Sequence, residues 1–183
     1  MAGDRTHGAG SDCGSPLLLD LDRAFTEAGL KVVRYNMPYR QRRPTGPPVR
    51  GGAELDRLGL AFEVDSLREQ GFGPVFLGGH SYGGRQSTIL ASAQPMLADG
   101  LLLFSYPLHP PRKPEELRTA HFPELRTPSL FIHGTRDPFG TIAEMETALR
   151  LIPAKHRLVS LERAGHELKD ASTIVPAFLD FFV

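Results

Sequence analysis

Short runs of apolar residues alternate along the chain with stretches in which apolar residues recur at helical spacing. The compact runs are KVVRY at 31–35, PVFLGG at 74–79, GLLLFSY at 100–106, SLFIHG at 129–134 and RLVSL at 157–161. Each is short and bounded by turn-forming residues, so each predicts a β-strand. The continuous apolar runs indicate strands buried on both faces, whereas the alternation in the last run is typical of an edge strand.

Helical patterns occupy the intervals between these strands. The first helix follows Ser15-Pro16, which fits an N-cap with proline at the first helical position, and Gly29 ends it. Further helices are expected up to about Gly71, over 83–97, from a Thr141–Glu144 capping box to Pro153, and up to Val183. Strands that alternate with helices predict an α/β fold, with a mostly parallel sheet flanked by helices.

The connection over 107–128 is rich in proline and has room for one small helix, around 114–120. A separate lid domain does not fit in it. In parallel sheets of this class, ligands bind beyond the carboxyl ends of the strands. The residues just after each strand are therefore the ones to search for chemistry.

Length and composition limit the alternatives. A chain of 183 residues fits one domain, and 21 basic residues balance 21 acidic ones. Zero net charge gives no overall field toward nucleic acid or an anionic membrane, so neither is expected as a partner. A single cysteine, Cys13, excludes an internal disulfide. No membrane-spanning or signal-peptide pattern is present, and a cytoplasmic protein is the expectation.

The stretch Gly79-His80-Ser81-Tyr82-Gly83 matches G-x-S-x-G, with a predicted strand before it and a predicted helix after it. That context is the one a nucleophile elbow requires. The glycines fit because strand and helix backbones pass closely at such a turn. As a bare pattern the motif is common and usually marks an ordinary Gly/Ser loop, but its context favours Ser81 as a nucleophile.

A serine nucleophile needs a base and a group that orients the base, in the chain order Ser, Asp/Glu, His. Asp137 follows the strand at 129–134, and His166 follows the strand at 157–161. Taken alone, Asp137 reads as a turn residue before Pro138, and His166 as a surface-loop histidine. Because all three residues occur in the required order at strand ends, Ser81, Asp137 and His166 are predicted to form a catalytic triad.

Charge that develops on the substrate oxygen requires hydrogen-bond donors. One is expected from the Tyr82 N–H, directly after the nucleophile. The other is expected from the glycine-rich turn His7-Gly8-Ala9-Gly10, through the Ala9 N–H, with Gly8 as the alternative. The competing interpretation is a flexible glycine-rich tail, because the turn lies so near the start of the sequence.

Together these motifs resemble the α/β-hydrolase superfamily. The stretches THGAGSD, VFLGGHSYGGR, LRTPSLFIHGTRDPFG and AGHELK are most similar to small, lidless, dienelactone-hydrolase-like proteins. That branch includes testis-expressed proteins and the hydrolase-like domain of a chromatin acetyltransferase-complex subunit. The resemblance implies a carboxylesterase-like enzyme without a cofactor that acts on a small-molecule ester or acyl substrate.

The sequence departs from this family at its start. The superfamily has eight strands, and only five are found here, which correspond to its fourth through eighth. The family's third strand lies between its fourth and fifth, so its loss would leave a gap beside the nucleophile strand. We therefore expect residues 1–183 to be a single domain, truncated at its N-terminus. The alternative is that residues 1–6 supply a minimal strand.

Other polar residues have less certain roles. His7, His80 and His133 lie at strand ends, but a metal site is not expected there. His109 follows a strand and is a candidate for contact with substrate or a plain loop histidine. Arg40 belongs to a basic loop over 36–52 that favours a carboxylate or phosphate on the substrate, although a solvated loop is the simpler interpretation.

The predicted function is hydrolysis of carboxylic esters or related acyl bonds through Ser81, His166 and Asp137. A second interpretation is that the fold serves as a non-catalytic interaction module. The complete set of triad residues argues against this second interpretation, and the short start of the chain argues for it.

Overall fold

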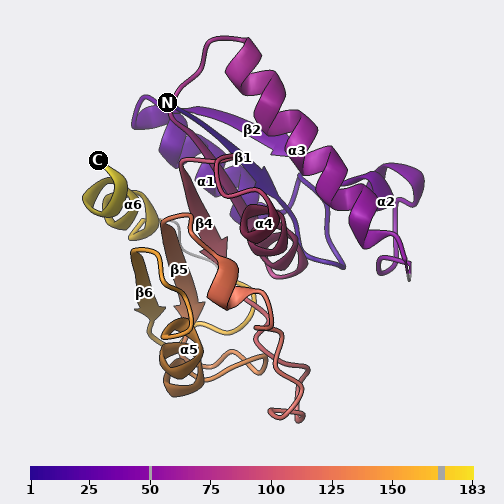
Figure 1. Ribbon diagram of the computed structural model, residues 1–183, viewed down its shortest axis with the longest axis vertical. Coiled ribbons are helices and arrows are strands. Elements are labelled where there is room, and N and C mark those ends of the chain that lie inside the picture. Colours follow the sequence, from indigo (N-terminus) through magenta and orange to yellow (C-terminus); the bar gives the residue numbers. More distant parts are fainter. Residues whose placement is uncertain (50, 169–171) are drawn as a thin grey trace.

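Six parallel strands form one sheet at the centre of the protein (Figure 1). The computed structural model describes residues 1–49, 51–168 and 172–183. The strands are β1 (Ala2–Thr6), β2 (Lys31–Tyr35), β3 (Val75–His80), β4 (Gly100–Phe104), β5 (Ser129–Gly134) and β6 (His156–Leu161), in the spatial order β2-β1-β3-β4-β5-β6. The predicted α/β class, the five strands predicted from apolar runs and the edge position of residues 157–161 are confirmed.

Strand β1 corrects the expectation of five strands and a gapped sheet. It pairs in parallel with β2 on one side and β3 on the other, so that Ala2 lies opposite both Lys31 and Val75. The alternative in which the first six residues supply a short strand is therefore confirmed. Alanine, glycine and aspartate are poor strand formers. Here the hydrogen-bonding groups of two neighbouring strands need partners, and this requirement outweighs the local preference.

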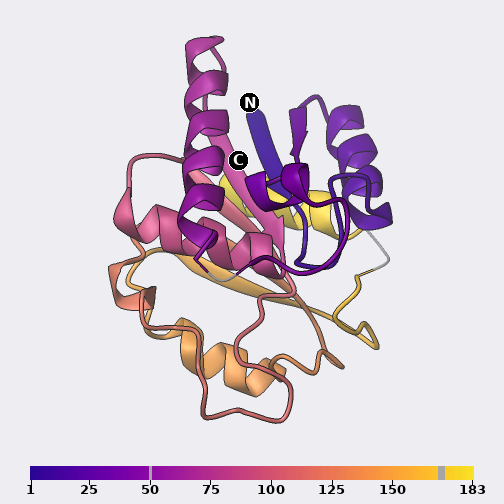
Figure 2. The ribbon, with the colours of Figure 1, turned by 90° about the vertical axis from the view of Figure 1, so that its right-hand side faces the viewer.

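Helices cover both faces of the sheet (Figure 2). Side chains of α1 (Pro16–Glu27) and α6 (Ile174–Phe182) pack on one face, against residues such as Phe76 and Leu102. Those of α3 (Ala53–Glu69), α4 (Tyr82–Ala93) and α5 (Ile142–Leu149) pack on the other, against residues such as Leu77 and Leu101. Neighbouring strand residues thus enter opposite cores, as the pleat of a two-sided buried strand requires.

The connections differ from the prediction in two places. The basic loop contains a short helix, α2 (Pro38–Arg42), which was not expected. The small helix expected around 114–120 is absent, and a 3₁₀ turn, η1 (Phe122–Glu124), lies further along instead. The Phe122 side chain is fully buried against Tyr106 and Phe131, whereas residues 111–117 are exposed. The buried aromatic ring thus fixes where the connection turns, and no separate lid domain is present between β4 and β5.

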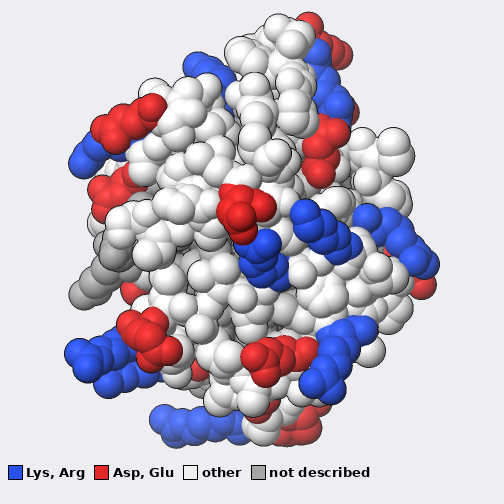
Figure 3. Space-filling model, turned by 90° about the vertical axis from the view of Figure 1, so that its left-hand side faces the viewer, with Lys and Arg blue, Asp and Glu red and all other residues white. Residues whose placement is uncertain are grey.

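The surface shows no dominance of one charge on the face drawn in Figure 3, where acidic and basic side chains are interspersed. Among the helices of the described residues, none is long and apolar enough to span a bilayer.

Candidate active site

Ser81 sits on a strained turn between β3 and α4. Its backbone has φ 51° and ψ −111°, a conformation that costs a non-glycine residue about 1–3 kcal/mol. Glycines let the two elements approach: a Cβ on Gly79 would lie 2.5 Å from the Gly83 carbonyl carbon, and one on Gly84 would lie 2.7 Å from the Gly79 oxygen. This crossing, together with the strained backbone, is the geometry expected of a nucleophile elbow.

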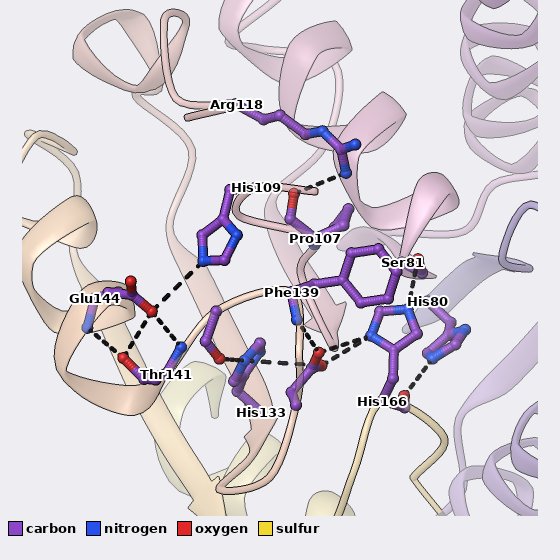
Figure 4. Close-up of polar contacts among 12 residues, drawn as sticks. His80, Ser81, Pro107, His109, Arg118, His133, Phe139, Thr141, Glu144 and His166 are labelled. Carbon is purple, nitrogen blue, oxygen red and sulfur yellow. Dashed lines mark hydrogen bonds and ion pairs between the residues drawn. The ribbon is translucent and has the colours of Figure 1, made fainter. Parts of the chain in front are cut away.

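The structure brings Ser81, His166 and Asp137 into one chain of hydrogen bonds at the carboxyl ends of the strands. Figure 4 labels Ser81 and His166 and draws the contact between them. His166 Nε2 lies 2.8 Å from Ser81 Oγ, and His166 Nδ1 lies 2.8 Å from Asp137 Oδ2. The second carboxylate oxygen, Asp137 Oδ1, is 3.0 Å from the same nitrogen. Both distances along the chain are short enough for direct hydrogen bonds.

The partners of Asp137 determine which nitrogen of His166 carries the proton. The carboxylate only accepts hydrogen bonds, and Oδ1 also accepts one from the Phe139 N–H at 2.9 Å. His166 must therefore donate from Nδ1, which leaves Nε2 free to accept the hydroxyl proton of Ser81. A base in this tautomer, aligned on a serine oxygen, can deprotonate that serine as it attacks.

Two neighbours hold His166 in place. His80, which precedes the nucleophile, donates from Nε2 to the His166 backbone carbonyl at 2.8 Å, and burial lowers the pKa of His80. The Phe139 ring lies against the imidazole, with ring centroids 4.3 Å apart. Sequence reasoning placed His80 only as an unlikely metal ligand, and its position beside Ser81 was the one signal for this role.

His133 lies behind Asp137 without competing for it. Its Nε2 donates to the Gly140 carbonyl at 2.8 Å, and the same nitrogen lies further away, at 3.7 Å, from Asp137 Oδ2. Burial of this ring is the largest influence on its pKa and lowers it, so the neutral form is favoured. The negative charge of Asp137 is therefore available to the imidazole of His166.

A cavity of about 360 Å³ opens over Ser81 and His166, and residues 8–11 form one of its walls. A Cβ placed on Gly8 would lie 2.9 Å from His80 Nδ1 and 3.5 Å from the Ser81 Cβ. The glycine-rich turn after β1 is therefore packed directly against the elbow rather than forming a free tail. A larger hollow of about 840 Å³ borders His166 but not Ser81.

Of the two residues predicted to donate to the oxyanion, Ala9 lines this cavity and Tyr82 directly follows Ser81, which also lines it. Tyr82 is the first residue of α4, where an N–H has no acceptor within its own helix. Ala9 lines the cavity wall. Among the described residues, neither of these N–H groups forms a backbone hydrogen bond.

Two candidate substrate contacts lie elsewhere. The Arg40 guanidinium is buried and donates to the backbone carbonyls of Ala9, Ser11, Arg43 and Gly46. The His109 ring donates from Nδ1 to the Pro110 carbonyl at 2.8 Å, and its Nε2 lies 3.5 Å from Glu144 Oε2 (Figure 4). As far as the structure describes its lining, the cavity over Ser81 includes neither side chain.

The three histidines considered for metal binding form no ligand cluster within the described part of the chain. His7 is buried and turned toward Met37 and Tyr39, His80 toward His166, and His133 toward Gly140. Each occupies a separate hydrogen-bonding environment.

Comparison with known proteins finds one matching family model and several solved structures of similar fold. A family model described as "Alpha/beta hydrolase domain" matches residues 5–174. Among solved structures, a dienelactone hydrolase from Anabaena variabilis is 23% identical with a TM-score of 0.75, and the match covers 99% of this chain and 84% of that one. Est1E from Butyrivibrio proteoclasticus, solved with ferulic acid, is 14% identical with a TM-score of 0.80, covering 98% and 88%. A monoacylglycerol lipase from Paleococcus ferrophilus is 16% identical with a TM-score of 0.77, covering 99% and 93%.

Proposed function

Because the chain belongs to the α/β-hydrolase family, we propose that it is a serine hydrolase that cleaves carboxylic esters or related acyl bonds of small molecules. The observation that carries this proposal is the continuous hydrogen-bond chain from Ser81 through His166 to Asp137, with 2.8 Å at both steps. The open cavity above it supports a small or extended substrate.

In the proposed reaction, Ser81 Oγ attacks the substrate carbonyl carbon while His166 Nε2 takes the hydroxyl proton. Asp137 holds the imidazole in the required tautomer and stabilises its charged form. The tetrahedral intermediate then collapses, the bond to the leaving alcohol breaks, and His166 gives that alcohol its proton. Water, deprotonated by His166, then attacks the acyl-enzyme carbonyl. As the second tetrahedral intermediate collapses, the bond to Ser81 Oγ breaks, His166 returns its proton to that oxygen, and the carboxylic acid leaves.

The negative oxygen of each tetrahedral intermediate would accept hydrogen bonds from the Tyr82 and Ala9 N–H groups. Removal of one such donor typically costs a factor of about 100 to 1,000 in kcat. Every step in this scheme uses only protein groups and water, so the proposal invokes no cofactor.

Labelling with a fluorophosphonate probe tests the proposal. The wild-type protein is expected to be labelled, and Ser81→Ala is expected to abolish labelling. Ser92→Ala is a matched control, because Ser92 lies about three turns further along the helix that Ser81 caps and donates to the Ile89 carbonyl. A correctly folded wild-type protein that resists labelling would instead favour the non-catalytic interaction module, and a Ser81→Ala variant that is still labelled would refute Ser81 as the nucleophile.

A further inference from the structure

The two amides proposed as oxyanion donors come from separate parts of the chain. One belongs to the turn after β1, and the other to the first residue of α4. The pairing of β1 with β3 ends at Thr6 and Gly79, so no β-ladder joins the two segments that carry the amides. For both N–H groups to point at one oxygen, side chains must hold the two segments in register.

Side chains hold the first segment by its carbonyl. The Gly8 carbonyl oxygen accepts from the Tyr39 hydroxyl at 3.0 Å and from His7 Nδ1 at 2.9 Å, and the same hydroxyl lies 3.1 Å from the Ala9 carbonyl oxygen. The Gly8 C=O and the Ala9 N–H belong to one planar trans peptide, so they point in opposite directions. Fixing the carbonyl toward Tyr39 therefore fixes the direction of the Ala9 N–H.

His7 is committed to this arrangement by its own partners. A carbonyl can only accept and an amide N–H can only donate, so His7 donates from Nδ1 to Gly8 while Nε2 faces the Met37 N–H at 3.4 Å. Burial lowers the pKa of His7, which favours this neutral form. Arg40 adds a second restraint, because its Nη2 donates to the Ala9 carbonyl at 2.9 Å and its Nε to the Ser11 carbonyl at 2.8 Å.

Asp56 connects this assembly to the elbow. Its side chain is fully buried on α3, where Oδ1 accepts from the Tyr39 N–H at 3.0 Å and Oδ2 accepts from the Tyr82 hydroxyl at 2.8 Å. The rings of Tyr39 and Tyr82 also pack edge to face, with centroids 5.6 Å apart. One carboxylate therefore binds the residue that holds the Gly8 peptide and the residue that follows the nucleophile.

We propose that Tyr39 and Asp56 are positioning residues that hold the Ala9 and Tyr82 amides in register around the oxyanion. The inference rests on the proposed hydrolase function. Neither residue touches the reacting atoms: the path runs from Tyr82 through Asp56 and Tyr39 to the Gly8 peptide. If one of these hydrogen bonds is lost, the Ala9 or Tyr82 N–H can move away from the oxyanion. A misplacement of about 1 Å can cost a factor of about 100 in rate.

The decisive variants remove single oxygen atoms and leave the ring packing in place. Tyr39→Phe and Tyr82→Phe are each expected to lower kcat by about 10- to 100-fold with little change in KM, because the oxyanion exists only after the attack. The inhibition constant of a trifluoromethyl ketone, whose adduct with Ser81 carries an oxyanion, is expected to rise by the same factor. Asp56→Ala removes both carboxylate oxygens and is expected to lower kcat by at least the same factor, because the Tyr39 N–H and the Tyr82 hydroxyl both lose their acceptor.

Tyr106→Phe is the matched control. Tyr106 is buried, as Tyr39 is, and its hydroxyl likewise donates to a backbone carbonyl, that of Arg118, at 2.7 Å. Tyr106→Phe should lower the thermal unfolding midpoint by a similar amount to Tyr39→Phe and Tyr82→Phe, but it should not lower kcat selectively. If Tyr39→Phe and Tyr82→Phe keep wild-type kcat, or lose activity only in proportion to Tyr106→Phe, the positioning role is wrong while the hydrolase function stands. If the wild-type protein is not labelled by the fluorophosphonate probe, the proposed function and this inference fall together.

Discussion

Replacing Asp137 with asparagine should reverse the tautomer of His166. Asparagine offers one oxygen and one NH₂ in place of two carboxylate oxygens. The Phe139 N–H, 2.9 Å from Oδ1, will retain the asparagine oxygen, which turns the NH₂ toward His166 Nδ1 at the former Oδ2 position, 2.8 Å away. The imidazole nitrogen must then accept, and the proton moves to Nε2.

An imidazole with its proton on Nε2 donates to Ser81 Oγ instead of accepting from it, so it cannot act as the base. A change of this kind in a Ser-His-Asp triad lowers kcat by about 10⁴. At about 1.36 kcal/mol for each factor of ten, this corresponds to about 5.4 kcal/mol of transition-state stabilisation. Folding stability should change little, because asparagine keeps the size of the side chain and the hydrogen bond to Phe139.

The assay is hydrolysis of p-nitrophenyl acetate, together with the rate of fluorophosphonate labelling and a thermal unfolding curve. Asp99→Asn serves as control, because Asp99 likewise accepts from a backbone N–H, that of Val75 at 2.7 Å, but precedes β4 at the opposite end of the sheet. The control should keep wild-type turnover. A kcat for Asp137→Asn within tenfold of wild type would refute the tautomer argument and the assignment of Asp137 as the orienting group.

Two further predictions concern stability. Gly79→Ala should lower the free energy of unfolding, measured in urea, by about 3 kcal/mol or more, because its Cβ would lie 2.5–2.6 Å from backbone atoms of Gly83 and Gly84. Gly10→Ala is the control: its Cβ would have open space around it, so this variant should unfold like wild type. Equal unfolding midpoints for the two variants would contradict the close crossing at the elbow. Burial lowers the pKa values of four histidines, that of His121 from 6.5 to about 4; the other three are His7, His80 and His133. As the pH falls, the unfolded chain therefore binds protons at these histidines before the folded protein does. The free energy of unfolding should then decrease progressively from about pH 6.5 toward pH 4. The urea midpoint at pH 7.5 should exceed that at pH 5, and His121→Gln should reduce the difference; a midpoint independent of pH would show that these rings are not buried as neutral groups.

The sequence was most informative where one local pattern determines the outcome. The strands at 74–79 and 129–134 are continuous apolar runs, which predict burial on both faces of the sheet. The Thr141–Glu144 capping box is a contact between residues three positions apart. The order and strand-end positions of Ser81, Asp137 and His166 follow from the same local reading. These features needed no knowledge of distant contacts.

Features that depend on partners far along the chain were either missed or, like the first strand, predicted only as an alternative. Nothing local in Ala2–Thr6 favours a strand, and its conformation comes from β2 and β3 on either side. In the sequence, Arg40 looks like a solvent-exposed cation of a loop. Its buried position was missed because carbonyls that it binds, such as those of Ala9 and Ser11, lie about 30 residues earlier. Asp56 reads as an ordinary acidic residue in the first turn of a helix, and only the fold reveals the two tyrosines that bind it.

The place of β1 in the sheet also bears on how the protein folds. Its partners lie about 30 residues away in β2 and about 70 residues away in β3, since Ala2 pairs with Lys31 and with Val75. The entropic cost of closing a loop grows with its length, so pairing with β2 is favoured first and pairing with β3 requires the longer closure. The turn carrying Ala9 and the elbow carrying Ser81 meet only when that longer closure is made. Hydrogen exchange during refolding should therefore protect β1 amides bonded to β2 before those of β3 that face β1, and activity should return with the later step.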